Sequence, residues 1–144
     1  MSIHLSPYIN LDGTAKEAVY FYEKALGATI VNIHTLGDMP ADPNFPLPEE
    51  MKQRVMHAHL KVGDSDLMFS DTFPGMNYQP GDTVTIALYP SDEAKAREIF
   101  EALADGGEVA VPLQPTDWSP LYGRVKDKFG VTFQVNVLSG AAQG

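Results

Sequence analysis

Two histidines separated by a single residue, His57 and His59, are the first candidates for chemistry in this sequence. If their segment is a strand, both imidazoles project from one face, about 6–7 Å apart, and such a pair can share a zinc ion. An imidazole also titrates near neutral pH, which makes a metal-free His57 a candidate general base. The structural alternative is that His57 hydrogen-bonds within a pocket wall while His59 lies near its rim. We favour this alternative, because the neighbouring strand offers no carboxylate in matching register except Asp71.

Asp71 and Asp127 are two carboxylates that invite comparison with a catalytic pair. Asp127 precedes a Lys-Phe-Gly turn, where an aspartate side chain commonly accepts hydrogen bonds from backbone N–H groups. Asp71 ends an expected strand and begins a loop. We therefore predict a structural role for each aspartate.

Several aromatic side chains fall on or beside loops instead of on helix stripes: Phe69, Phe73, Tyr78, Trp118 and Tyr122. Aromatic rings at the mouth of a pocket supply apolar area, and Tyr and Trp add a polar tip that orients a ligand. The same rings can instead pack a dimer or wall off the pocket. Residues 38–50, which carry four prolines, form a segment too long for a simple connection, and either a lid or an arm around a partner subunit fits it.

The composition is that of a soluble globular protein, with 44% hydrophobic and 20% charged residues among 144. A net charge of −9 with scattered Lys and Arg argues against a nucleic-acid surface and would suit a cationic ligand. The absence of cysteine excludes disulfides, thiolate catalysis and a Cys-type zinc site. No apolar run approaches the ~20 residues of a membrane span, and no secretory signal is visible. We expect a cytoplasmic protein with neither a membrane nor a nucleic-acid partner.

The first half of the chain predicts a strand, a helix and three more strands. Apolar and polar side chains alternate over residues 3–11, as in a half-buried strand. The helix should begin after Thr14, the N-cap of a capping box, and end at Gly27. The remaining strands are expected at residues 28–36, 54–62 and 66–71, the last two forming a hairpin.

The second half repeats this order without repeating the sequence. A strand at residues 83–88 leads to a helix that is capped by Ser91 and stopped by Gly106-Gly107. Further strands are expected at residues 109–111, 122–126 and 131–138. The chain therefore reads βαβββ twice, which predicts an α+β fold with two modules, about residues 1–72 and 82–139. An eight-stranded sheet covered by two helices would bury both apolar helix faces.

Paired βαβββ modules and several motifs resemble the vicinal-oxygen-chelate superfamily of glyoxalase I, extradiol dioxygenases and bleomycin-resistance proteins, and within it the PhnB-like group. The motifs are Pro7-Tyr8, Gly13…Ala18…Phe21-Tyr22, Val55-Met56-His57-Ala58 through Gly63, Leu67-Met68-Phe69-Ser70-Asp71 and Trp118…Tyr122-Gly123…Asp127-Lys128-Phe129-Gly130-Val131…Asn136. The resemblance implies a single domain over residues 1–144, with a curved eight-stranded mixed sheet, helices on its convex side and a pocket on its concave side. It also implies a homodimer, whose modules pair within one chain or swap between two.

Strand alternation assigns side chains to the pocket face. In residues 54–62, Met56 and Ala58 should face a helix, whereas Val55, His57 and His59 should face the pocket. In the same way, Val84 should pack outward and Thr85 inward. Counting the loop aromatics, the candidate ligand-binding residues are Ser6, Tyr8, His57, His59, Thr85, Trp118, Tyr122, Gln134 and Asn136, to which the resemblance adds Phe69.

Enzymes of the superfamily hold a divalent metal with about one His or Glu ligand from each of four strands. The resemblance places those positions at Ser6, Phe69, Thr85 and Gln134. None of these four side chains is an imidazole or a carboxylate, and such a neutral set cannot compete with water for a divalent cation. We predict that the metal site is absent and that no cofactor is bound.

Two functions follow from these patterns. The first is a metal-independent small-molecule binding protein of the antibiotic-sequestering type, with an aromatic-lined concave pocket. The second is a metal-dependent lyase, isomerase or dioxygenase-type enzyme that uses His57 and His59, or an enzyme with His57 as its base. A methyltransferase has no support, because no Gly-rich loop follows a strand to hold a nucleotide-like cofactor. The sequence favours the binding protein and names no ligand.

Overall fold

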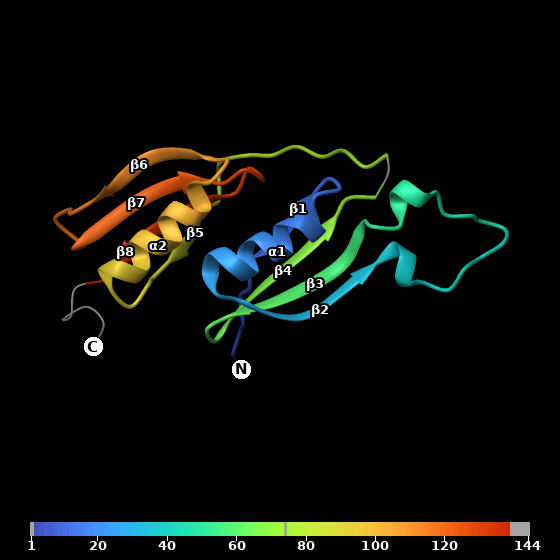
Figure 1. The fold of residues 1–144 in the computed structure, drawn as a ribbon, viewed down its shortest axis with the longest axis horizontal. Helices are drawn as coiled ribbons and strands as arrows, with labels where there is room; N and C mark the ends of the chain where they lie inside the picture. The colour runs from blue at the N-terminus through green and yellow to red at the C-terminus, as the bar shows by residue number, and fades with distance from the viewer. Residues whose placement is uncertain (1, 74, 139–144) are drawn as a thin grey trace. The chain divides into compact units, whose positions relative to one another are not determined.

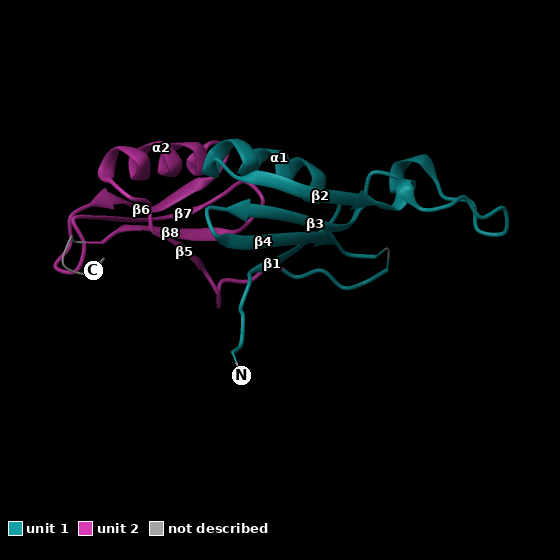
Figure 2. Cartoon of the chain, turned by 90° about the horizontal axis from the view of Figure 1, so that it is seen from below, with its two compact units in different colours: residues 1–79 teal, residues 80–144 magenta. Residues whose placement is uncertain are grey.

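The computed structural model describes residues 2–73 and 75–138, and the chain divides into two compact units, residues 1–79 and 80–144 (Figures 1 and 2). The expected module limits at residues 1 and 139 lie outside the described residues. Unit 1 contains β1 (Tyr8–Leu11), α1 (Ala15–Leu26), β2 (Thr29–Thr35), β3 (Val55–Val62) and β4 (Ser65–Asp71). Unit 2 contains β5 (Ile86–Leu88), α2 (Glu93–Ala104), β6 (Glu108–Gln114), β7 (Leu121–Lys126) and β8 (Thr132–Val137). The predicted βαβββ order is confirmed in both units.

Each unit folds into a four-stranded mixed sheet with the same topology. The strand order is β1-β4-β3-β2 in unit 1 and β5-β8-β7-β6 in unit 2, and the first strand of each unit runs parallel to the last. Ile9 pairs with Phe69 in unit 1, and Ile86 pairs with Phe133 in unit 2. This shared register makes residues of the two units equivalent, so that Tyr8 corresponds to Thr85 and Ser70 to Gln134.

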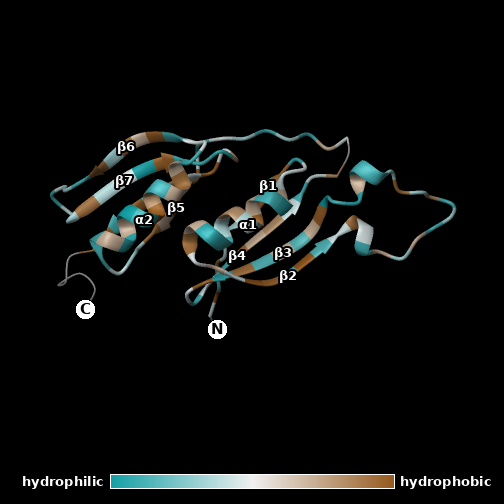
Figure 3. Ribbon diagram, in the orientation of Figure 1, coloured by the Kyte–Doolittle hydropathy of each residue, from teal (hydrophilic) through white to brown (hydrophobic). Residues whose placement is uncertain are grey.

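In each unit the helix covers one face of its sheet (Figure 2). Hydrophobic and hydrophilic segments alternate along α1 and α2, as expected of amphipathic helices (Figure 3). In unit 1, the fully buried Tyr22 of α1 stacks on Phe69 of β4, with ring centroids 5.5 Å apart. In unit 2, a Cβ built on Gly123 of β7 would lie 2.7 Å from Phe100 of α2. A glycine is therefore required at this close approach of helix and strand.

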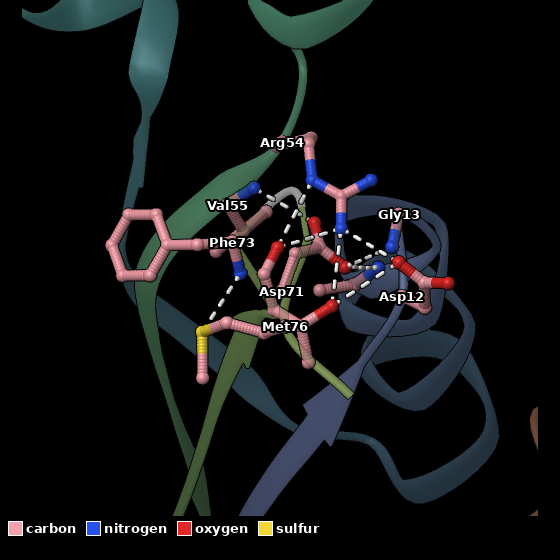
Figure 4. Close-up of polar contacts among 9 residues, drawn as sticks. Asp12, Gly13, Arg54, Val55, Asp71, Phe73 and Met76 are labelled. Carbon is pink, nitrogen blue, oxygen red and sulfur yellow. Dashed lines mark hydrogen bonds and ion pairs between the residues drawn. The ribbon is translucent and has the colours of Figure 1, made fainter. Parts of the chain in front are cut away.

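The first turn of α1 is capped by a residue that is distant in the sequence. Thr14 makes no cap hydrogen bond, which corrects the predicted capping box. The carboxylate of Asp71, at the end of β4, instead accepts hydrogen bonds from the backbone N–H groups of Gly13 (2.7 Å) and Ala15 (3.1 Å) (Figure 4). Its second oxygen accepts from the N–H of Val55, at 2.8 Å. The structural role predicted for Asp71 is confirmed.

The other predicted caps are partly confirmed. Gly27 adopts the left-handed conformation and ends α1 as predicted. Asp92, one residue after the predicted Ser91, caps α2 by accepting from the N–H of Lys95. Asp127 is buried and accepts from the N–H groups of Phe129 and Val131, which confirms its predicted role in the turn.

Three strand predictions need correction. β1 begins only at Tyr8, and Ile3 and Leu5 are 86% and 89% exposed, because the contact with β4 starts only at the carbonyl of Pro7, which accepts from the N–H of Met68. β5 is likewise short, and Val84, predicted to be packed, is 80% exposed. β6 is longer than predicted and contains Pro112, which is tolerated because β6 is an edge strand with an irregular register.

A β-bulge changes the predicted faces at the start of β3. The register shifts between the pairs His34–His57 and Thr35–Val55, so that Met56 is the extra residue. Val55 is therefore buried and Met56 is exposed, the reverse of the prediction. Beyond the bulge the alternation recovers, and Ala58 faces α1 as expected. Over the described ranges, the structure contains no helix of sufficient length and apolarity to cross a membrane.

Replacing Asp71 by Ala should lower the free energy of unfolding by about 3 kcal/mol, because it leaves the buried N–H groups of Ala15 and Val55 without acceptors. The control is Asp12→Ala, which removes an exposed carboxylate bound to Arg54 and should cost much less than Asp71→Ala, because solvent screens an exposed ion pair. Urea denaturation measures both values. Equal losses for the two variants would contradict the role assigned to Asp71.

Candidate functional site

The candidate site residues lie on the sheet face opposite the helix, which we call the helix-free face. In β8, Phe133, Val135 and Val137 are buried on the side of α2, so Gln134 and Asn136 project from the helix-free face of unit 2. The predicted alternation of this strand is confirmed.

A chain of hydrogen bonds crosses this face of unit 2. The hydroxyl of Tyr122, on β7, donates to Oε1 of Gln134 at 2.9 Å. Nε2 of Gln134 donates to the hydroxyl oxygen of Thr85, just before β5, at 2.8 Å. Both ends of the Gln134 amide are therefore engaged, and three segments of the unit are joined through one side chain.

An exposed aromatic ring lies at one end of this chain. Trp118, from the loop between β6 and β7, contacts Tyr122 edge to face, with ring centroids 5.6 Å apart. Its side chain is 63% exposed. Trp118 thus offers apolar area next to a fixed row of polar groups, a combination typical of small-molecule sites.

The helix-free face of unit 1 carries both candidate histidines. Nδ1 of His57 lies 3.1 Å from the hydroxyl of Tyr8, and the two rings are 5.8 Å apart. Nε2 of His59 lies 2.7 Å from Oδ1 of Asp66. Each imidazole therefore has a protein partner; the structural alternative predicted a hydrogen bond for His57, whereas the contact of His59 with Asp66 was not predicted.

Asp66 is a functional candidate that the sequence analysis missed. Its carboxylate binds Lys61 at 2.8 Å and His4 at 3.2 Å, in addition to His59. The hydrogen bonds from Lys61 and His59 hold the pKa of Asp66 well below its ordinary value. The predicted hairpin between residues 54–62 and 66–71 contained part of the signal, but its loop is one residue shorter than expected. The two-residue loop at Gly63-Asp64 places Asp66 directly opposite Lys61.

Two predicted site positions need correction. Phe69 is fully buried against Tyr22, so its side chain lies on the helix side of β4 and cannot line the helix-free face. The unit 1 equivalent of Gln134 is Ser70, whose hydroxyl donates to Oδ1 of Asn10 at 3.1 Å. Ser6 precedes β1 and is not paired in the sheet, and the equivalent of Thr85 is Tyr8.

The corrected positions do not fit the metal that the resemblance implies. The side chains at these four strand positions are a phenol, two hydroxyls and an amide, from Tyr8, Ser70, Thr85 and Gln134. Neutral oxygen donors of this kind bind a divalent cation weakly without a carboxylate or an imidazole. Across residues 2–73 and 75–138, no three His, Cys, Asp or Glu side chains are grouped so that they could hold a metal ion.

The segment between β2 and β3 forms an apolar groove of its own. The groove has a volume of about 640 Å³, and its walls include Met39, Pro43, Phe45 and Leu47. Figure 1 shows this segment extending beyond the ends of β2 and β3. No predicted site residue lines the groove. A lid role for the segment stays a prediction.

Comparisons with known proteins agree with this fold. The family model described as "Glyoxalase/Bleomycin resistance protein/Dioxygenase superfamily" matches residues 8–135. Protein YjdN of Escherichia coli is 32% identical over 141 residues, which cover 93% of this chain and 95% of YjdN. The crystal structure of protein PA1353 from Pseudomonas aeruginosa is similar with a TM-score of 0.84 and 36% identity, covering 95% of this chain and 98% of PA1353. A PhnB protein from Bacillus cereus, described as a putative 3-demethylubiquinone-9 3-methyltransferase, has a TM-score of 0.75 at 22% identity over 94% of this chain and 99% of its own, a likeness of fold alone.

The lowered pKa of Asp66 predicts a pH-dependent stability. Because the folded state favours the ionised form, the stabilisation is complete above the ordinary aspartate pKa of 3.8 and is lost as the pH falls below that value. Asp66→Asn should therefore lower the urea midpoint at neutral pH, and its difference from the wild type should shrink near pH ~3. Asp64→Asn, in the adjacent turn, is the control. A difference between Asp66→Asn and the wild type that does not change with pH would contradict the prediction.

Proposed function

The chain belongs to the glyoxalase/bleomycin resistance protein/dioxygenase superfamily, and we propose that it binds a small organic molecule on the helix-free face of unit 2 without using a metal ion. The observation that carries the proposal is the hydrogen-bond chain from Thr85 through Gln134 to Tyr122, which ends beside the exposed ring of Trp118. This arrangement supplies what a small-molecule site requires, namely positioned polar groups next to apolar area.

The state of Gln134 supports binding over metal chemistry. Its amide oxygen already accepts from Tyr122, and its amide nitrogen is a donor, which cannot ligate a cation. A ligand that approaches this face meets a row of neutral groups whose orientations are fixed by one another. Such pre-organisation lowers the entropic cost of binding.

A second candidate function is an enzyme that uses the histidines of unit 1. The contact between Tyr8 and His57 favours it, because a phenol and an imidazole within 3.1 Å can pass a proton between them. In this candidate, His57 is the general base, or His57 and His59 hold a metal ion. The engagement of His59 by Asp66 supports the metal-free form.

The proposal retains a homodimer as the assembly. Ile3 and Leu5 are 86% and 89% exposed, and Phe45 is 79% exposed. Exposed apolar side chains at these levels are consistent with burial against a second subunit. A cytoplasmic location stays a prediction.

Elemental analysis separates the two functions. We expect protein purified without chelator or His-tag to contain much less than one transition metal per chain, and to stay so after dialysis against Zn²⁺, Ni²⁺ or Mn²⁺. The neutral donor set on the strands is the reason. One tightly bound metal per chain that is lost in His57→Ala but kept in the exposed control His34→Ala would establish the metal-dependent candidate instead.

Binding can be followed through Trp118, the only tryptophan of the chain. We expect 3-phenylpropan-1-ol, a neutral aromatic alcohol, to change the fluorescence of Trp118 in a saturable way. The affinity should be the same in the presence and absence of EDTA. Gln134→Leu removes the central polar group and should weaken binding about tenfold. The exposed Gln79→Leu is the matched control. Unchanged affinity in Gln134→Leu would show that the wrong face has been assigned, and binding that requires a metal would contradict the proposal.

A further inference from the structure

Arg124, in the middle of β7, is a half-buried cation whose guanidinium has no hydrogen-bond or ion-pair partner in the described part of the chain. Its neighbours Gly123 and Val125 are buried toward α2, so the alternation of the strand places Arg124 on the helix-free face of unit 2. It lies directly opposite Gln134 on β8 and Val111 on β6. Within residues 2–73 and 75–138, the structure shows no hydrogen bond or ion pair to its guanidinium.

Among the half-buried lysines and arginines of the described residues, only Arg124 lacks a side-chain partner. The other half-buried arginine, Arg54, donates to Asp12 and to the carbonyl oxygen of Thr72 (Figure 4). Lys126, two residues along β7 from Arg124, contacts Asp82 at 3.6 Å. The chain holds 19 acidic and 10 basic residues, so carboxylates are plentiful. On the strands beside Arg124, however, the nearest acidic residue in register is Glu108, which lies opposite Lys126.

A second unpaired group lies on the same face. Oδ1 of Asn136 is buried and has no hydrogen-bond partner among the described residues. Asn136 pairs with Tyr122, so it is the diagonal neighbour of Arg124 across β7 and β8. Diagonal neighbours of this kind lie about 7–8 Å apart. The face therefore presents an unpaired donor and an unpaired acceptor on either side of the satisfied Gln134 amide.

We propose that the helix-free face of unit 2 binds an organic oxyanion, with Arg124 as its charge partner. A guanidinium presents two parallel N–H groups, which match the oxygens of a carboxylate and of a phosphonate or phosphate equally well. Asn136 accepts a hydrogen bond from a hydroxyl or amino group a few bonds away on the ligand, and Trp118 covers its apolar part. The inference rests on the proposed function and replaces the cationic ligand that the net charge suggested with an anionic one.

Burial gives the physical reason why Arg124 requires an anion. A half-buried guanidinium has lost part of its hydration, and a hydrogen-bonded anion restores that interaction in surroundings that screen charge less than water does. Hydrogen bonds to charged groups are roughly twice as strong as neutral ones. The charge of the ligand should therefore dominate its affinity for this face.

The test uses four probes that share a phenyl group and differ in the charged end. They are 3-phenylpropionate, 2-phenylethylphosphonate, the neutral 3-phenylpropanamide and the cationic 3-phenylpropylamine, each titrated against Trp118 fluorescence at constant ionic strength. We expect the better of the two anions to bind about 10- to 100-fold more tightly than the amide. The ratio between carboxylate and phosphonate then identifies the anion class that the site prefers.

Variants of Arg124 test the assignment. Arg124→Gln should reduce the affinity for the anions to that for the amide and leave the amide itself unchanged, whereas Arg124→Lys should retain part of the preference. Arg97→Gln, on the exposed surface of α2, is the control and should behave as the wild type.

Each contrary outcome has a distinct meaning. If the wild type binds the amide as tightly as the anions, the proposed function holds and the charge assignment fails. If Arg124→Gln weakens the amide and the anions by the same factor, Arg124 supports the structure and not the charge of the ligand, which also overturns the inference. If none of the four probes changes the fluorescence at millimolar concentration, both the inference and the proposed function are contradicted.

Discussion

The carboxylate of Asp71 holds unit 1 together at the point where its elements meet. It accepts hydrogen bonds from the turn before α1 and from the first residue of β3, while its own backbone ends β4. Three segments are thus fixed against one buried group, and α1 is held on one side of the sheet. Tyr22 then stacks on Phe69, and the side chains that alternate with Phe69 along β4 point to the helix-free face. The positions of Tyr8, His57 and His59 follow from that sorting.

Unit 2 reaches the same topology by a different route. Asp92 caps its own helix, so no carboxylate from a distant strand is needed at this end of α2. The close contact is made instead at Gly123, where the missing side chain lets Phe100 approach β7. Because Gly123 faces α2, its neighbours Tyr122 and Arg124 must face away from the helix. The glycine that permits the packing therefore also determines which side chains of β7 can meet a ligand.

Local patterns in the sequence are sufficient to predict most of the helices and strands. The predictions that the structure corrects share one physical cause. Period-two alternation gave the correct faces for β8 but failed at Met56, because a bulge inserts a residue that hydropathy does not reveal. Thr14 was a reasonable cap until Asp71, 58 residues away from Gly13, competed for the same N–H groups. Phe69 is assigned to the pocket by its aromatic character and by the resemblance, whereas the pairing of Ile9 with Phe69 and of Ile86 with Phe133 shows that Ser70 is equivalent to Gln134. Bulges, caps from distant residues and strand register all depend on which segments pair in the folded chain. Local patterns in a single sequence do not contain that information.

The charges of the two helix-free faces are organised in opposite ways. On unit 1, His4, His59 and Lys61 all converge on Asp66, so the face neutralises itself and its carboxylate stays ionised. On unit 2, the residue directly opposite Arg124 is Gln134, which is neutral. A glutamate at that position would lie beside the guanidinium and pair with it, as Asp12 pairs with Arg54. The amide instead bonds Thr85 and Tyr122 and leaves the guanidinium without a partner. Gln134 is thus one of the four residues that make the strand positions unfit for a divalent metal, and it also leaves Arg124 available to an anion from solution.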